Sequence, residues 1–179
     1  MSDSPGAVLI AREKIAARVT ELAAELTRHY AGRRPLFLGV MNGALFFLAD
    51  LVREVALDVE ISCVRLASYA GTHSTGQVRG LDDADLHDAV RDREVLIVDD
   101  ILDTGRTLHA LVAWLRALGA TDVKICVLLE KERARDMPVR ADWAGFRIAD
   151  EFVIGYGLDF DGRFRQLPEI RVLDPGKGP

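Results

Sequence analysis

Cysteine is scarce in this chain, with only Cys63 and Cys126 among 179 residues. The two lie far apart and each sits in an apolar run, so we expect both to be buried and reduced, as in a cytoplasmic protein. A disulfide framework is therefore not expected to stabilise the fold. With 49% hydrophobic and 28% charged residues, the chain has the composition of one domain, residues 1–179, whose core can bury a central sheet.

Long apolar segments are also missing. No run approaches the ~18 apolar residues of a membrane-spanning helix, and residues 1–6 lack the basic and apolar stretches of a secretory signal. We therefore expect a soluble, cytoplasmic protein without a membrane partner.

An excess of basic residues is absent too. The formal net charge is -5, and the isoelectric point is about 5.4. Proteins whose main partner is nucleic acid normally present a clustered basic face, so we expect no nucleic-acid partner. An anionic ligand would have to be held by a few local groups.

Several common catalytic signatures do not occur. There is no Gly-x-x-x-x-Gly-Lys-Ser/Thr segment, so a P-loop hydrolase is unsupported. No Gly-x-Gly-x-x-Gly follows a predicted strand, which disfavours a dehydrogenase-like nucleotide-binding protein. The four histidines show no ligand or triad spacing; they are His29, His73, His87 and His109.

The spacing of apolar residues predicts helices and strands in alternation. In the first half, residues 10–30 and 46–52 have the apolar spacing of helices, and 36–40 form a short apolar run typical of a strand. Residues 58–67 alternate in character, with Val59, Ile61 and Cys63 on the face that we expect to be buried.

The second half continues this order. Residues 94–98 form an apolar, β-branched run of the kind that is buried on both faces of a parallel sheet. A helix over 107–118 and strands over 123–129 and 151–156 follow. The alternation predicts an α/β fold with a mostly parallel sheet, in which ligands bind beyond the carboxyl ends of the strands.

The segment 95–108, Val-Leu-Ile-Val-Asp-Asp-Ile-Leu-Asp-Thr-Gly-Arg-Thr-Leu, carries the candidate site. Gly105 allows a tight turn, Thr104 and Thr107 offer hydroxyls, and free N–H groups at the start of a helix favour a phosphate. Asp99 and Asp100 can accept hydrogen bonds from sugar hydroxyls and position a hard divalent cation. The alternative is that these aspartates merely cap the following helix.

This segment resembles the motif that binds phosphoribosyl pyrophosphate (PRPP) in type I phosphoribosyltransferases. The resemblance implies a mostly parallel central sheet flanked by helices, with a small hood region and a mobile lid loop. It also implies that residues 104–107, including Arg106, bind the phosphate. An aspartate at position 103 is similar to the hypoxanthine-guanine branch, where it acts as acid/base toward N7 of the purine, so Asp103 is the catalytic candidate.

Other segments resemble the same branch over residues 10–173. The Gly/Ser/Thr-rich stretch 68–80 begins with a pair similar to that of the lid, Ser68 and Tyr69. Lys131 matches the lysine that contacts O6 of the purine, and the segment 151–159 resembles the base pocket and a second metal site. The resemblance assigns base stacking to Phe152, backbone contacts to Val153, magnesium ligation to Asp159 and pyrophosphate binding to Arg165.

Each of these residues also has a simpler interpretation. Without the resemblance, Phe152 would be placed in the core, Tyr69 at a strand end, and Lys131 and Arg165 among solvated surface cations.

One departure concerns the loop Met41-Asn42-Gly43, which corresponds to the pyrophosphate loop of the family. The family generally carries Lys or Arg where this chain has Asn42. The resemblance also implies a cis peptide between Met41 and Asn42, a strained bond of the kind that persists mainly at functional sites.

The resemblance implies transfer of the phosphoribosyl group of PRPP to a 6-oxopurine, hypoxanthine or guanine, by a homodimer or homotetramer that uses Mg²⁺. Asp99, Asp100 and Asp159 would be near the metal. The rival is a regulator of the same fold that binds PRPP or a nucleotide without turnover. Asp103, Lys131, Asp159 and the lid pair Ser68 and Tyr69 argue against it, since a sensor needs no acid/base for N7.

Overall fold

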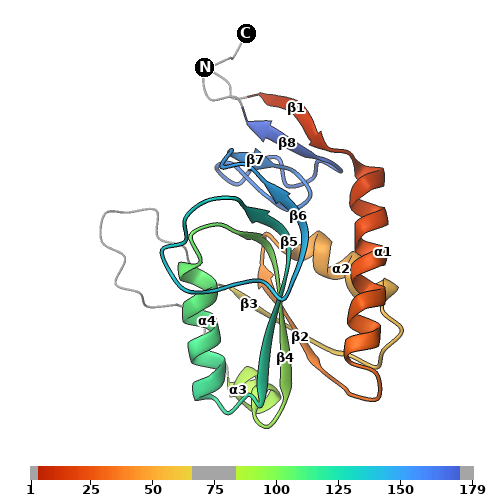
Figure 1. Cartoon of the computed structure of the whole chain (residues 1–179), viewed down its shortest axis with the longest axis vertical. Helices are drawn as coiled ribbons and strands as arrows, with labels where there is room; N and C mark the ends of the chain where they lie inside the picture. The colour runs from red at the N-terminus through yellow and green to blue at the C-terminus, as the bar shows by residue number, and fades with distance from the viewer. Residues whose placement is uncertain (1–3, 66–83, 174–179) are drawn as a thin grey trace.

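Five parallel strands form the larger of two sheets in the computed structural model, which describes residues 4–65 and 84–173 (Figure 1). Their order across the sheet is β3 (Glu60–Arg65), β2 (Leu36–Met41), β4 (Glu94–Leu102), β5 (Asp122–Lys131) and β6 (Trp143–Ile148). The expected α/β fold with a mostly parallel sheet is confirmed. Because all five strands run the same way, their carboxyl ends meet at one edge of the sheet.

A small antiparallel sheet stands above that edge (Figure 1). It contains β1 (Pro5–Ile10), β8 (Ile170–Leu173) and β7 (Val153–Ile154), in that order. It joins the first and last described segments of the chain and forms the expected hood. Ile10, Val153 and Ile170 share an apolar cluster with residues of the larger sheet, so the hood is packed onto the core.

Within the described ranges, four helices cover the larger sheet: α1 (Arg12–His29), α2 (Leu45–Glu54), α3 (Ala84–Val90) and α4 (Arg106–Ala117). The first two lie on one face, and α3 and α4 lie on the other (Figure 1). The central strand β4 serves both: Leu96 and Val98 join the cluster with α1 and α2, whereas Val95 and Ile97 join the cluster with α3 and α4. This two-sided burial is why residues 95–98 of β4 are continuously apolar.

The predicted orientation of strand 58–67 was wrong. The strand is shorter, Glu60–Arg65, and Val64 is its buried residue, whereas Ile61 is 50% exposed. Cys63 is exposed, against expectation, and only Cys126 is buried. The reason is that β3 is an edge strand: Val64 packs into the cluster that contains α3, whereas the opposite face, with Ile61 and Cys63, is exposed. Alternating apolar residues cannot indicate which face that is.

Several short elements were not predicted. They are β1, α3, β6 and β8, none of which is longer than seven residues. The proposed lid, with Ser68 and Tyr69, lies outside the described residues. None of the helices in the two described ranges has both the length and the apolar character needed to span a bilayer.

Two buried tyrosines differ in whether the hydroxyl has a hydrogen-bond partner among the described residues, and this difference predicts opposite effects on stability. Tyr30 is 1% exposed and its hydroxyl has no hydrogen-bond partner among the described residues. The hydroxyl of Tyr156 donates to Asp50 Oδ2 at 2.6 Å and so connects the hood to α2. We expect Tyr30→Phe to raise the free energy of unfolding and Tyr156→Phe to lower it, each by about 1 kcal/mol. Urea denaturation measures both, and a destabilising Tyr30→Phe would contradict the assignment.

Candidate active site

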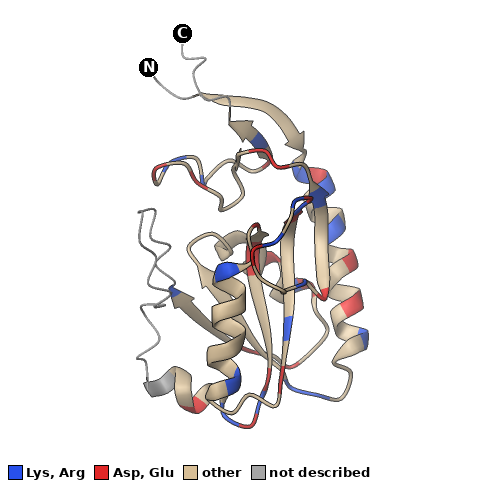
Figure 2. Cartoon of the chain, turned by 60° about the vertical axis from the view of Figure 1, so that its left-hand side comes forward, with Lys and Arg blue, Asp and Glu red and all other residues tan. Residues whose placement is uncertain are grey.

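A cavity of about 870 Å³ opens at the carboxyl ends of β2 and β4 and at the start of α4. Figure 2 shows acidic and basic residues together at this end of the sheet, facing the hood. The cavity brings together segments that are far apart in the chain. Eleven of the predicted site residues line it: Met41, Asn42, Gly43, Asp99, Asp100, Asp103, Thr104, Gly105, Thr107, Asp159 and Arg165.

Asp99 and Asp100 lie at the floor of this cavity, within the last part of β4. Asp99 is the one buried charged residue among those the structure describes. Its Oδ1 accepts a hydrogen bond from the backbone N–H of Asp100 at 2.9 Å. Burial, followed by the charge of Asp100, raises the pKa of Asp99 well above its usual range. Burial also raises the pKa of Asp100, although a hydrogen bond from Asp99 and the charge of Arg165 oppose that shift.

The loop after β2 is pressed against this acidic pair. A Cβ atom at Gly43 would lie 1.8 Å from Asp100 Oδ2, so only glycine fits beside the carboxylate. From the hood side, a Cβ at Gly157 would lie 2.0 Å from the carbonyl oxygen of Gly43, and Gly157 also has φ +103°. The peptide between Met41 and Asn42 is cis, as the resemblance implied.

The start of α4 has the features of an anion site. Its N-cap is Gly105, with φ 83° in the left-handed region, and no side chain caps the first turn. The interpretation of the aspartates as helix caps is therefore wrong. The free N–H groups and the hydroxyls of Thr104 and Thr107 face a cavity in which a phosphate can bind. Arg106 does not line it; its side chain is mostly exposed and pairs with Asp136 at 2.8 Å.

Four charged side chains form a closed ring beside the cavity. Lys131 Nζ lies 3.5 Å from Asp103 Oδ2 and 3.1 Å from Asp150 Oδ1. Arg133 Nη1 lies 3.2 Å from Asp103 Oδ1 and 3.3 Å from Asp150 Oδ2. The hydrogen bond from Lys131 is the main reason that the pKa of Asp150 is lowered. Each cation therefore contacts both acids, and the longest contact joins the two predicted functional residues, Asp103 and Lys131.

Arg135 forms hydrogen bonds with the backbone at Asp103. Its Nη1 donates to the carbonyl oxygens of Leu102 at 3.3 Å and Asp103 at 2.8 Å, and its Nη2 donates to Glu130 Oε1 at 2.5 Å. These bonds join the ends of β4 and β5. They give hydrogen-bond donors to two carbonyl groups at the end of β4.

The hood supplies the remaining predicted residues. Arg165 pairs with Asp159 at 2.6 Å and donates to the carbonyl oxygen of Gly157 at 2.5 Å. Phe152 is 50% exposed and meets Phe160 edge to face, at 5.5 Å between ring centroids. Val153 is buried in β7. Phe152 therefore has a free surface for a planar ligand, which a core phenylalanine would lack.

The described residues include no cluster of three side chains that could hold a metal ion by themselves. Asp100 and Asp159 nevertheless line one cavity, and their carboxylates are the hard oxygen donors that Mg²⁺ prefers. Mg²⁺ commonly takes one or two carboxylates and completes its shell with water and substrate phosphates. The donor set fits a magnesium ion that binds together with a phosphorylated ligand.

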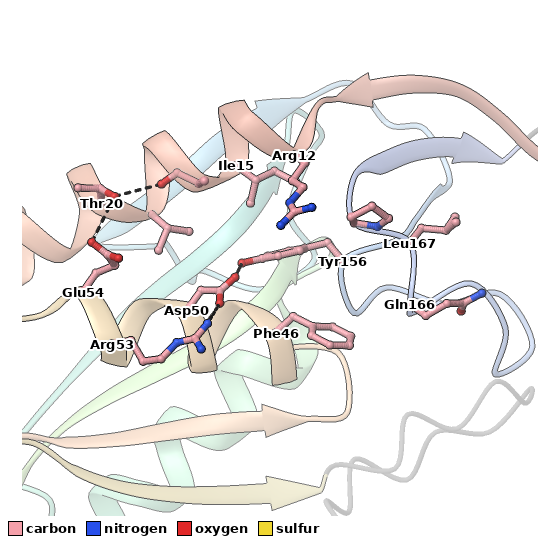
Figure 3. A pocket seen from close by; sticks show the side chains of 13 residues that line it. Arg12, Ile15, Thr20, Phe46, Asp50, Arg53, Glu54, Tyr156, Gln166 and Leu167 are labelled. Atoms are coloured by element: carbon pink, nitrogen blue, oxygen red, sulfur yellow. Dashed lines mark hydrogen bonds and ion pairs between the residues drawn. The ribbon is translucent and has the colours of Figure 1, made fainter.

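A second cavity, of about 680 Å³, lies between α1, α2 and the hood segment 166–168 (Figure 3). Figure 3 shows the bond from Tyr156 to Asp50 crossing it and Arg53 pairing with the same carboxylate. None of the predicted site residues that the structure describes lines it. We therefore assign the chemistry to the cavity at the ends of β2 and β4.

Sequence reasoning missed four charged residues of the site: Arg65, Arg133, Arg135 and Asp150. Arg65 lines the main cavity, and the other three surround Asp103. The three arginines share one feature that the sequence could have shown, a place at or just after the end of a strand. Arg65 ends β3, and the two others follow the end of β5. Which of the many charged residues after a strand contact the site is decided by side-chain packing.

Comparisons with known proteins place the chain among characterised relatives. A family model described as a phosphoribosyl transferase domain matches residues 9–161. The chain is 43% identical over 169 residues to the hypoxanthine-guanine phosphoribosyltransferase of Bacillus subtilis, covering 94% of this chain and 93% of that protein. It is 41% identical to the bifunctional protein TilS/HprT of Listeria innocua, but spans only 26% of that longer protein.

Solved structures agree. A hypoxanthine-guanine phosphoribosyltransferase from Bacillus anthracis superposes with a TM-score of 0.88 at 34% identity, covering 96% of this chain and 100% of that one. The hypoxanthine phosphoribosyl transferase of Trypanosoma cruzi gives a TM-score of 0.88 at 33% identity, covering 98% and 94%.

The burial of Asp99 predicts that its ionised carboxylate lowers the stability of the fold. Because its pKa is raised on folding, the folded chain holds the proton more tightly than the unfolded chain, and stability falls as pH rises above the usual carboxyl pKa of about 4. Asp99→Asn removes that cost, so we expect a higher melting temperature at pH 7, by roughly 2–4 °C for each kcal/mol relieved. The gain should vanish below a pH of about 3.5.

Calorimetry from pH 3 to 8 without ligands measures this effect. Asp88→Asn, an exposed carboxylate on α3, is the matched control and should show no such dependence. An Asp99→Asn variant that melts at or below the wild-type temperature at pH 7 would contradict the prediction.

Proposed function

This chain belongs to the phosphoribosyltransferase family, in its hypoxanthine-guanine branch, and we propose that it transfers the 5-phosphoribosyl group of PRPP to N9 of hypoxanthine or guanine. The products are IMP or GMP and pyrophosphate. The observation that carries the proposal is the contact between Asp103 and Lys131 beside the cavity that the PRPP-type segment lines. One group handles a proton and the other donates a hydrogen bond, as N7 and O6 on one edge of a 6-oxopurine require.

The start of α4 would bind the 5-phosphate of PRPP. The backbone N–H groups that follow Gly105, together with the hydroxyls of Thr104 and Thr107, are the donors. Asp99 and Asp100 would accept hydrogen bonds from the ribose hydroxyls, which orients C1′ toward the base. This division explains how an acidic protein binds a phosphate: the acids contact the sugar and the amides contact the anion.

The base would lie between the hood and the charge ring. Phe152 would stack on the purine, the backbone of Val153 would contact its edge, and Lys131 would donate to O6. Asp103 would take the proton from N7 as the C1′–N9 bond forms and the bond from C1′ to the pyrophosphate oxygen breaks. For this to happen Asp103 and Lys131 must separate, and each keeps a partner when they do, Arg133 for the acid and Asp150 for the lysine.

The pyrophosphate group would lie against the loop 41–43 and Arg165. Asp159, with Asp100 or Asp99, would hold Mg²⁺, which when bound neutralises the charge of the pyrophosphate oxygens. Arg165 now pairs with Asp159, so binding of the anion would exchange a carboxylate partner for a phosphate one. Ser68 and Tyr69 would cover the site, as the resemblance to the family's lid suggests.

The defining experiment compares hypoxanthine, guanine, xanthine and adenine as substrates with PRPP and magnesium. We expect turnover of hypoxanthine and guanine, with adenine a very poor substrate. Binding of PRPP without turnover of any base would instead support the non-catalytic regulator.

Asp103→Asn tests the acid/base role. The amide cannot accept the N7 proton, so we expect kcat to fall by roughly 10²–10⁴-fold while PRPP binding and folding persist. Asp136→Asn is the matched control, because Asp136 pairs with Arg106 outside the cavity. Steady-state kinetics with guanine measures both variants, and near-normal turnover by Asp103→Asn would remove Asp103 from the mechanism.

Lys131→Gln tests the choice of base. Lysine can only donate, so it suits O6 and opposes the 6-amino group of adenine; an unpaired buried donor costs about 1–3 kcal/mol. Glutamine offers a donor or an acceptor, so kcat/KM should fall for guanine and hypoxanthine. The ratio of their kcat/KM to that of adenine should decrease by roughly tenfold or more. If the variant keeps the full preference of the wild type, another group reads position 6.

We also propose that the protein is cytoplasmic and assembles as a homodimer or homotetramer of a single-domain chain. The support is the resemblance to the family. In the Trypanosoma cruzi relative, the C-terminal region has a role in the oligomeric state of that protein.

A further inference from the structure

Arg65 lies beside the pyrophosphate loop because of the register between two strands. In the parallel pair of β2 and β3, Arg65 is opposite Met41, so the last residue of β3 stands next to the point where the loop 41–43 begins. Its Nη2 donates to Asn42 Oδ1 at 3.4 Å. Arg65 also lines the same cavity as Asp100, Thr104 and Arg165.

The charge of Arg65 is not neutralised by any carboxylate in the described part of the chain. Within the same residues, its side chain donates a hydrogen bond to an amide oxygen, that of Asn42. Arg165, the other arginine of this cavity, is already paired with Asp159 at 2.6 Å. A guanidinium is always charged and presents several N–H donors in a plane, a geometry that matches phosphate oxygens. Among the described residues that line the cavity, Arg65 is therefore the cation that can contact an anion without first separating from a carboxylate.

Asn42 accounts for the position of this cation. The loop carries an uncharged amide where a Lys or Arg is usual, and the amide oxygen accepts from Arg65. The strand register places the backbone of Arg65 beside the start of the loop. Arg65 therefore lies on the same side of the cavity as a Lys or Arg at position 42 would. In this chain the cation beside the loop is therefore supplied by β3.

We propose that Arg65 binds the pyrophosphate moiety of PRPP, with Asn42 orienting its guanidinium. The inference rests on the proposed function, because it places a further ligand-binding residue in that site. Loss of the guanidinium should weaken the contact with the diphosphate oxygens and leave the purine pocket unaffected, since the base-binding candidates Lys131 and Phe152 do not line this cavity.

Arg65→Gln, which keeps a polar side chain without the charge, is the direct test. We expect the KM for PRPP to rise about tenfold, as for loss of one charged hydrogen bond to a phosphate, with little change in the KM for guanine or in kcat. Arg65→Lys should have a KM for PRPP between those of Arg65→Gln and the wild type. Arg91→Gln, an exposed arginine that does not line the cavity, is the matched control.

A relocated charge provides the decisive comparison. Adding Asn42→Lys to Arg65→Gln returns a cation to the loop, and we expect the KM for PRPP to recover most of its wild-type value. An unchanged KM for PRPP in Arg65→Gln overturns the proposal. So does a failure of Asn42→Lys to restore binding, or an equal loss for both substrates together with a lower melting temperature, since these indicate a structural role.

Calorimetric titration of pyrophosphate with magnesium separates this inference from the proposed function. If the wild-type chain turns over no base, the proposed function fails, but titration still compares the pyrophosphate affinity of the wild type and Arg65→Gln. We expect the variant to bind about tenfold more weakly. Equal affinity in the two proteins overturns the role of Arg65 whether or not the enzyme is active.

Discussion

The parallel pairing of β4 with β2 on one side and β5 on the other places three chain segments at one point in space. Each strand ends at the same edge, so the loop after β2 and the acids of β4 line one cavity, and the charged ring after β5 lies beside it. Hydrophobic burial of β4 on both faces is what holds this arrangement, because its apolar residues alternate between two cores. A shift in the pairing of β4 would move every functional group at once.

The same strand accounts for the electrostatic character of the site. Asp99 and Asp100 continue β4 beyond its apolar part, so the sheet carries two adjacent carboxylates into a poorly solvated position. Only glycine at position 43 leaves room beside them. Burial of the apolar half of β4 thus stabilises the fold, and burial of its acidic half lowers that stability. Such local destabilisation is common at functional sites.

Around Asp103 the charges are balanced differently. Here two acids and two bases are partly exposed and contact one another in a ring, so no charge is left without a partner. Such contacts are individually weak and can be exchanged at little cost. That suits groups that must separate when a substrate binds, whereas the buried pair of β4 needs no rearrangement to present its oxygens.

The sequence by itself determined the alternation of helices and strands, the identity of β4 as the central strand, and the acidic segment that follows it. These are local properties, since apolar periodicity and the order of residues 99–107 do not depend on distant contacts. The buried face of β3, the exposure of Cys63, the ring through Arg133 and Asp150, and the approach of Arg65 to Asn42 were decided only by the tertiary structure. Each depends on which distant segment packs against a residue, and the pattern of neighbours along a single chain does not contain that information.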